Sequence, residues 1–149
     1  MLPNPGFTVE HDGREIELFD KGLIAATVRV DGLALTAVSV HVFPFVQFGH
    51  RAEESRLANV WAAIGSALDK YEEHLALGGD FNTDRRDLLF NAAKRRLSSV
   101  MGTIPTHRGR ALDDIVCSGE MLVGDPIVVD GFSDHQLCLA DLTLRPSNV

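Results

Sequence analysis

The chain lacks any long hydrophobic run, and it contains little cysteine. No segment approaches the roughly 18 uninterrupted apolar residues of a membrane-spanning helix, and the N-terminal sequence MLPNPGFTVEHDGREIE does not have the basic-then-apolar layout of a signal peptide. Two cysteines, Cys117 and Cys138, have no metal-ligand spacing and are too few for a disulfide scaffold, so we interpret them as buried, reduced thiols. These absences exclude a membrane span and favour a cytoplasmic protein.

Positive charge is also scarce, because 14 basic side chains stand against 21 acidic ones and the net charge is −7. This balance argues against a protein that wraps duplex DNA through many phosphate contacts. Half of the basic residues nevertheless lie between positions 84 and 110, namely Arg85, Arg86, Lys94, Arg95, Arg96, Arg108 and Arg110. Such a local concentration suits a modest phosphorylated ligand, although a solvated helix face would have the same composition.

A chain of 149 residues with 45% apolar residues is long enough for one domain with a hydrophobic core, and we expect a single domain over 1–149. Strands are predicted at 15–19, 23–30 and 33–42, the last two joined by the hairpin signal Asp31-Gly32. Because both of these strands are apolar at nearly every position, we expect both faces of their sheet to be covered.

The remaining elements alternate between helix and strand. Apolar residues three and four apart predict an amphipathic helix over 51–74, and a second helix is expected from 87 to about 99. A strand is expected at 75–79, a loop at 104–111, and further strands at 113–119, 122–129 and 136–144. This order predicts an α/β or α+β class with a largely central sheet.

Polar residues cluster in four short segments, each at the end or start of a predicted strand: SVHV (39–42), GGDFNT (78–83), LDDIV (112–116) and FSDHQ (132–136). In GGDFNT the glycines allow a tight turn as the chain leaves the strand. Asp80 and Asn82 are two residues apart, so in an extended chain a proton acceptor and a neutral donor point the same way. An Asp/Asn turn that satisfies only local backbone groups is the alternative.

Asp134 and His135 are adjacent, so both can serve one site only if they lie in the loop before a strand. There Asp134 could bind a cation or hold the imidazole, while His135 could donate a hydrogen bond to a phosphoryl oxygen. His41 ends an apolar strand, where a core histidine is the alternative. Of the adjacent Asp113 and Asp114, only one can face the other groups.

Three more polar residues, His107, Arg108 and Arg110, lie shortly before that aspartate pair. All three could contact a ligand phosphate, and an ordinary surface loop would explain them nearly as well.

The four segments, in this order, resemble the C-terminal half of the endonuclease/exonuclease/phosphatase superfamily, which has a strand ending in histidine, then GDFN, then an aspartate in an "(I/L)D-x-I" strand, then SDH. These correspond to His41, to Gly79-Asp80-Phe81-Asn82, to Leu112-Asp113-Asp114-Ile115 and to Ser133-Asp134-His135. The resemblance covers about residues 23 to 144. It implies part of a four-layer α/β/β/α sandwich, with a mostly antiparallel sheet and helices on one face.

The resemblance also implies a Mg²⁺-dependent attack of water on a phosphoester, with Mn²⁺ as a possible substitute. Asp80 would orient or deprotonate the water, Asn82 would hold the phosphate, and His135 and His41 would stabilise the transition state. Asp134 would bind the metal or fix a histidine, and Asp113 would support His135 from behind.

The family's first strand, with its Asn or Asp, and its metal-binding glutamate have no counterpart in this sequence. We therefore expect the N-terminal, metal-binding half of the family domain to be missing. The uncovered sheet face would then require a second copy of the chain, a complementing chain or upstream residues. Three hypotheses follow: a phosphodiesterase, nuclease or phosphatase completed from elsewhere, a phosphate-binding module without catalysis, and a remnant or wrongly placed start.

Overall fold

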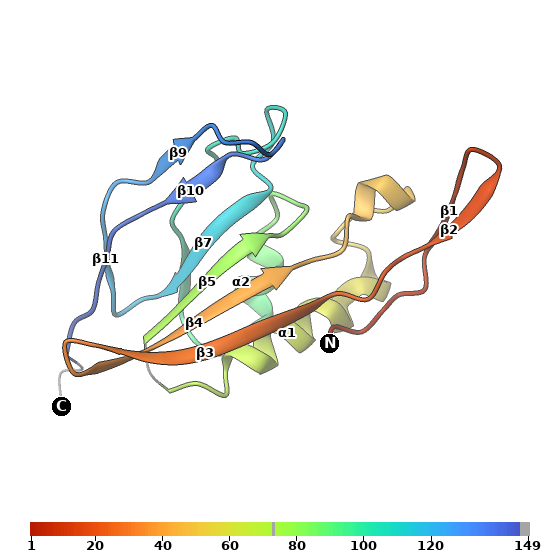
Figure 1. Cartoon of the computed structure of the whole chain (residues 1–149). Coiled ribbons are helices and arrows are strands. Elements are labelled where there is room, and N and C mark those ends of the chain that lie inside the picture. The colour runs from red at the N-terminus through yellow and green to blue at the C-terminus, as the bar shows by residue number, and fades with distance from the viewer. Residues whose placement is uncertain (73, 147–149) are drawn as a thin grey trace.

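The computed structural model describes residues 1–72 and 74–146. A five-stranded sheet in the order β3-β4-β5-β7-β6 forms its centre (Figure 1). Only the β4–β5 pair is parallel, and the other neighbouring strands of this sheet are antiparallel. The strands are β3 (Gly22–Val30), β4 (Leu33–His41), β5 (His74–Asp80), β6 (Leu97–Ser99) and β7 (Asp113–Ser118).

Two Asp-Gly pairs close β-hairpins. Asp31 and Gly32 have φ of 51° and 82°, as the predicted two-residue turn between β3 and β4 requires. Asp12 and Gly13 have similar φ values, 51° and 71°, and join β1 (Thr8–His11) to β2 (Arg14–Glu17). The sequence predicts a strand over most of β2 but not β1. The β1–β2 hairpin projects from one end of the sheet (Figure 1).

Both helices are shorter than predicted. α1 spans Ala58–Leu68 and follows two 3₁₀ turns, η1 (Phe45–Phe48) and η2 (Ser55–Leu57). The predicted helix over 51–74 is therefore wrong at both ends. Glu73, within that prediction, lies outside the described residues. α2 spans Asp87–Ala92, and Ala93 has an extended ψ of 146°. The predicted helix to about residue 99 is therefore wrong, because the chain there turns away and forms β6.

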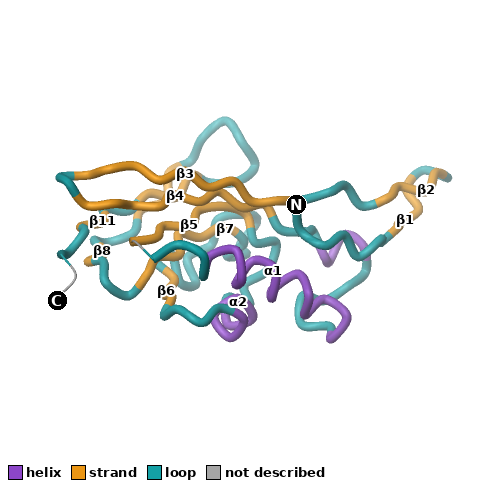
Figure 2. Tube along the Cα trace, turned by 90° about the horizontal axis from the view of Figure 1, so that it is seen from below, coloured by secondary structure: helices purple, strands orange, loops and turns teal. Residues whose placement is uncertain are grey.

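The core lies between one face of the sheet and the two helices, which cover the same side (Figure 2). Val38 and Val40 of β4 alternate inward and pair in register with Leu77 and Gly79 of β5. From α1 the core receives side chains one helical turn apart, which are Val60, Trp61, Ile64 and Leu68. This one-sided cover gives β4 its alternation between buried and exposed residues from Thr36 to His41.

The other face of the sheet is open over β3 and β4. Ile24 is 74% exposed, and Val28, Ala37 and Ser39 on the same face are exposed as well. The expectation that these strands are covered on both faces is therefore wrong for the single chain. We still predict that a second copy of the chain or a complementing chain covers the open face.

The last predicted strands are each divided in two. Residues 122–129 form β8 (Leu122–Val123) and β9 (Ile127–Val129), and residues 136–144 form β10 (Leu137–Leu139) and β11 (Leu142–Thr143). β9 pairs with β10 and β8 with β11, and β10 lies beside β7 (Figure 1). Both cysteines are free, Cys117 buried and Cys138 half-buried. Among the described residues, no helix has the length and apolar character needed to cross a membrane.

Candidate active site

Three neighbouring strands place three ionisable side chains in a row. His41 ends β4 and is in register with Asp80, the last residue of β5, which in turn is in register with Asp113, the first residue of β7. Because paired residues of adjacent strands share one face of a sheet, the three side chains lie together on the open face. The pairing of β4, β5 and β7 thus brings together the three predicted segments that contain His41, Asp80 and Asp113.

The GDFN segment is shaped by close packing and a left-handed residue. A Cβ on Gly79, whose φ is 153°, would lie 1.9 Å from the carbonyl oxygen of Val40, so only glycine fits there. Both glycines lie within β5, so their expected role in a turn is wrong. Asn82 has φ of 53°, which corrects the extended-chain argument for Asp80 and Asn82.

Asn82 still faces the site, although part of its hydrogen-bonding capacity is used locally. Its backbone N–H donates to Asp80 Oδ1 at 2.7 Å, and its side-chain Nδ2 donates to the Val42 carbonyl at 2.9 Å. The first of these bonds makes the Asp/Asn turn that the sequence offers as the alternative interpretation, whereas the second reaches a carbonyl 40 residues away. Asp80 and Asn82 nevertheless line the same hollow, so the turn and a ligand-facing role coexist.

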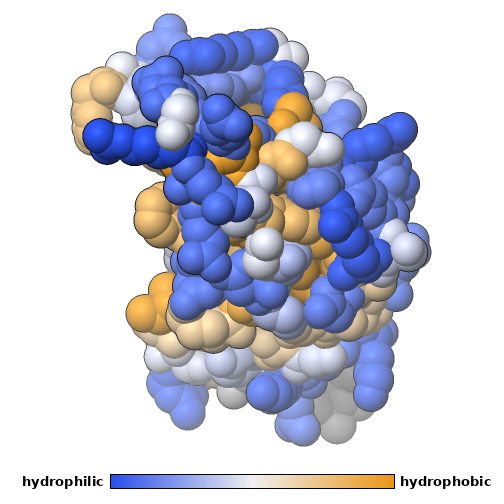
Figure 3. Space-filling model, turned by 90° about the vertical axis from the view of Figure 1, so that its right-hand side faces the viewer, coloured by the Kyte–Doolittle hydropathy of each residue, from blue (hydrophilic) through white to orange (hydrophobic). Residues whose placement is uncertain are grey.

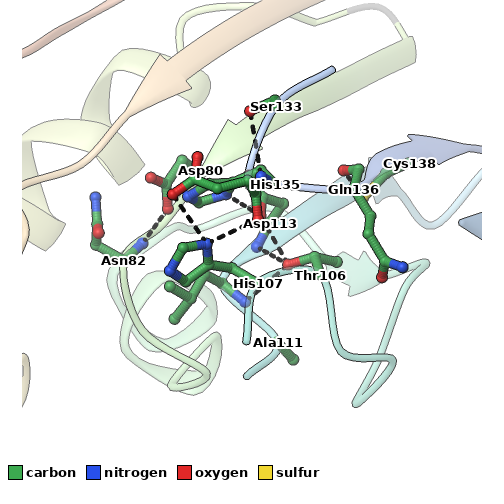
Figure 4. Close-up of polar contacts among 12 residues, drawn as sticks. Asp80, Asn82, Thr106, His107, Ala111, Asp113, Ser133, His135, Gln136 and Cys138 are labelled. Atoms are coloured by element: carbon green, nitrogen blue, oxygen red, sulfur yellow. Dashed lines mark hydrogen bonds and ion pairs between the residues drawn. The ribbon is translucent and has the colours of Figure 1, made fainter. Parts of the chain in front are cut away.

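Asp113 holds His135 (Figure 4). Its Oδ2 lies 2.7 Å from His135 Nδ1, and since a carboxylate only accepts, the imidazole donates through Nδ1 and presents Nε2 to the site. The Thr106 hydroxyl donates to the same carboxylate oxygen at 2.7 Å, and its oxygen accepts hydrogen bonds from the backbone N–H groups of Leu112 and Asp113. Thr106 is buried and was not predicted; a lone threonine in a predicted loop gave no signal.

The site histidines differ in electrostatic environment. Burial lowers the pKa of His41, and the neighbouring Lys21 ammonium lowers it further. For His135, burial alone would lower the pKa, but the hydrogen bond to Asp113 and the aspartate charges outweigh burial and raise it. Burial raises the pKa of Asp80, against the hydrogen bond from Asn82, and the charge of Asp113 adds to the rise. The site therefore holds two imidazoles whose pKa values are shifted in opposite directions, beside a carboxylate whose pKa is raised.

Replacing Asp113 with asparagine is expected to lower the pKa of His135, because the hydrogen bond and charge that raise it are lost. In the wild type, the Asp113–His135 pair makes its full contribution to the free energy of unfolding at pH values below the ordinary histidine pKa of 6.5. This contribution is lost as pH rises through the raised pKa of His135 in the folded protein. NMR titration of the imidazole measures the shift. Asp130→Asn is the control, since Asp130 accepts a hydrogen bond from the Gln136 side chain and none from His135. An unchanged His135 pKa in Asp113→Asn would contradict the assignment.

Asp134 and His135 lie in the loop before β10, as predicted. The Asp134 side chain is 66% exposed and lies 3.7 Å from Nδ1 of His107, which donates to the Asp134 carbonyl at 3.0 Å. His107 stacks on His135 with ring centroids 4.3 Å apart. His107, Asp134 and His135 thus form a group of possible metal ligands separate from the row at the strand ends.

Two more cationic features border the site. Arg108 and Arg110 are exposed and line a hollow of about 300 Å³ that also contacts Asn82, Asp134 and His135. Buried Arg86, seen in the sequence only as part of a basic cluster, donates to Asp114 at 2.9 Å behind the site. Asp114 therefore faces away from Asp113, and the prediction that only one of them faces the site is confirmed.

The residues at the strand ends fit a divalent cation. Asp80 and Asp113 each offer a carboxylate oxygen, and these atoms lie within 4.8 Å of each other and of a ring nitrogen of His135. Asp80 Oδ2 contacts only His41, at 3.6 Å, among the polar interactions of the described residues. Two adjacent carboxylates, with other positions left to water and a substrate phosphate, are an arrangement that suits Mg²⁺ and also Mn²⁺.

Comparison with known proteins places the fold. No family model and no curated protein sequence matches the chain. Among solved structures, an endonuclease/exonuclease/phosphatase family protein from Leptotrichia buccalis superimposes with a TM-score of 0.61 at 14% identity, over 92% of this chain and 59% of that one. The endonuclease/exonuclease/phosphatase from Bacteroides vulgatus gives 0.57 at 20% identity, over 77% and 51%.

A third structure, the mannosyl-6-phosphatase Bt3783 of Bacteroides thetaiotaomicron, gives a TM-score of 0.53 at 13% identity, over 76% of this chain and 53% of that one. The predicted resemblance is confirmed at the level of the fold, which is the mixed α+β fold of these structures. The chain spans between half and three fifths of the length of these three structures.

Proposed function

We propose that this chain provides the catalytic residues of a metal-dependent phosphoester hydrolase of the endonuclease/exonuclease/phosphatase type. The observation that carries the proposal is the Asp113–His135 hydrogen bond of 2.7 Å beside Asp80, on one face of the sheet at one end of its strands. The solved structures of similar fold support the class: one is a mannosyl-6-phosphatase, and the others carry the family description.

In the proposed reaction Asp80 takes a proton from water, whose oxygen forms a new bond to phosphorus while the bond to the leaving oxygen breaks. The raised pKa of Asp80 makes it a better base than an exposed aspartate. Protonated His135 donates from Nε2 to a phosphoryl oxygen, and Asp113 fixes its orientation. Asn82 and His41 contact the phosphate, and Arg108 and Arg110 add positive charge at the rim.

A bound Mg²⁺ would be held by Asp80 and Asp113, with Asp134 as the further ligand that the sequence suggests, and would neutralise charge developing on the phosphoryl group. The pair of carboxylates supports this assignment, because a cation between them relieves their mutual repulsion. Mn²⁺ is expected to substitute, since it accepts the same oxygen ligands.

Metal removal tests the proposed function. The purified chain is expected to hydrolyse p-nitrophenyl phosphate or bis(p-nitrophenyl) phosphate with Mg²⁺, to lose this activity in EDTA, and to regain it when Mg²⁺ or Mn²⁺ is restored. Calcium serves as a control ion, because it prefers more ligands at longer distances. Phosphate binding without turnover of either ester would instead favour the catalytically impaired binding module.

A further inference from the structure

Lys21 places an unneutralised positive charge beside the candidate active site. It directly precedes Gly22, which is in register with His41, and its Nζ lies 3.3 Å from Nε2 and 3.4 Å from Nδ1 of that histidine. No ion pair among residues 1–72 and 74–146 joins Lys21 to a carboxylate. A half-buried ammonium that faces the hollow without a carboxylate partner is therefore suited to bind an anion.

The ammonium borders a hollow of about 680 Å³, which is within the range of small-molecule sites. The polar side of the hollow is formed by the candidate catalytic groups His41, Asp80, Asn82 and His135. A phosphate that reaches Lys21 in this hollow therefore also lies at the groups proposed to hydrolyse it.

The β1–β2 hairpin forms an apolar side of the same hollow. Val9 and Ile16 are directly opposite each other in the hairpin and line the hollow together with Phe19, Pro44 and Phe48. The other face of the hairpin carries exposed glutamates, which are Glu10, Glu15 and Glu17. Figure 3 views the molecule from this end and shows apolar surface exposed between polar side chains.

We propose that the hollow binds a small phosphoester with an apolar leaving group, with the phosphate against Lys21 and the leaving group against Val9 and Ile16. This inference rests on the proposed function and names its substrate class. Hydrolysis breaks the bond from phosphorus to the leaving oxygen and forms one to the oxygen of water, whose proton goes to Asp80. The leaving oxygen takes up a proton from solvent in return and is released as an apolar alcohol. The outward glutamates disfavour a long polyanion at the hairpin.

Binding of two uncleavable phosphonates tests the proposal without turnover. Isothermal titration calorimetry with methylphosphonate and hexylphosphonate, at equal pH and ionic strength, is expected to give about tenfold or more tighter binding of the hexyl compound, because its chain buries additional methylene groups. Lys21→Met is expected to weaken both ligands by about 10- to 100-fold, and Lys21→Arg to retain most of the affinity, because charge-assisted hydrogen bonds are lost only in the former.

Changes in the hairpin separate the phosphate from the leaving group. Ile16→Thr keeps the β-branched shape and is expected to weaken hexylphosphonate several-fold while leaving methylphosphonate unchanged. Glu15→Gln, on the opposite face of the same hairpin, is the matched control and is expected to change neither ligand. Melting temperatures of the variants establish that each is folded.

The outcomes separate this inference from the proposed function. Hexylphosphonate binding that depends on Lys21, in a protein that cleaves no phosphoester, would support the site and contradict the hydrolase. Metal-dependent hydrolysis that is unaffected by Lys21→Met and Ile16→Thr would support the hydrolase and overturn the site. Equal affinity for both phosphonates, or no measurable binding of either by the wild type, also overturns the site.

Discussion

Replacing Asp80 with asparagine is expected to reduce the turnover of a phosphoester by about 100- to 10,000-fold, the usual contribution of a positioned general base. The substitution keeps the shape of the side chain and its acceptor for the Asn82 N–H, and replaces the charged oxygen that is proposed to take the proton and to bind Mg²⁺. Because burial raises the pKa of Asp80, a neutral amide at this position costs no charge desolvation, so the melting temperature should not fall.

The loss is measured as kcat in the presence of saturating Mg²⁺, with phosphonate affinity determined in parallel. In the wild type, activity should rise with pH through the raised pKa of Asp80, since the base acts in its deprotonated form, and Asp80→Asn should lose this rise. Asp31→Asn is the matched control, because the turn between β3 and β4 lies at the opposite end of both strands and tolerates asparagine. Wild-type turnover in Asp80→Asn would remove Asp80 from the proposed mechanism.

The central strands and their end residues could be predicted because local signals and strand pairing agree there. Asp31-Gly32 fixes the turn between β3 and β4 and therefore the register of the two strands, in which His41 is the last residue of β4. The site followed from four short motifs, of which strand pairing brings three to one end of the sheet, while the hydrogen bond from His135 to Asp113 ties the fourth to them. The same Asp-Gly signal at residues 12–13 was missed because Val9 is the only apolar residue of β1.

The helix ends could not be predicted because tertiary contacts decide them. Leu57 and Tyr71 pack against the core at helical spacing, yet neither is within α1. After α2, the backbone N–H groups of Lys94 and Arg95 donate to Asp69 at the end of α1, which draws the chain out of the helix. Apolar periodicity reports which residues are buried, and here it extends beyond the residues that are helical.

The electrostatic support of the site was equally hidden from the sequence. Lys21 occurs between predicted strands, and Arg86 belongs to a basic cluster whose ordinary interpretation is a solvated surface. Arg86 is instead buried, with its guanidinium 4.3 Å from the ring centroid of Phe81. Only the fold brings it to Asp114, which lies 28 residues further along the chain.

Removing either partner of the Arg86–Asp114 pair is expected to lower the free energy of unfolding by about 3–5 kcal/mol, because the remaining buried charge has no counter-ion. Arg86 donates to the carbonyls of Thr83, Ala111 and Leu112 as well as to Asp114. It therefore ties the loop after Asp80 to the strand that carries Asp113. Such a loss is a large fraction of the roughly 5–15 kcal/mol that stabilises a domain.

Urea unfolding of Arg86→Met, Asp114→Ala and the double variant measures the effect. Ser99 Oγ and the Met101 N–H also donate to Asp114, at 2.6 and 3.0 Å, so Asp114→Ala should leave these donors unpaired and be the more costly change. The double variant should lose less than the sum of the two single losses, since it leaves no isolated charge. Arg85→Ala is the matched control, because the adjacent arginine forms its ion pair with Asp87 at the surface and should matter far less. Single losses below about 1 kcal/mol, or strict additivity, would mean that water reaches the pair and that the loop and β7 are held together by other contacts.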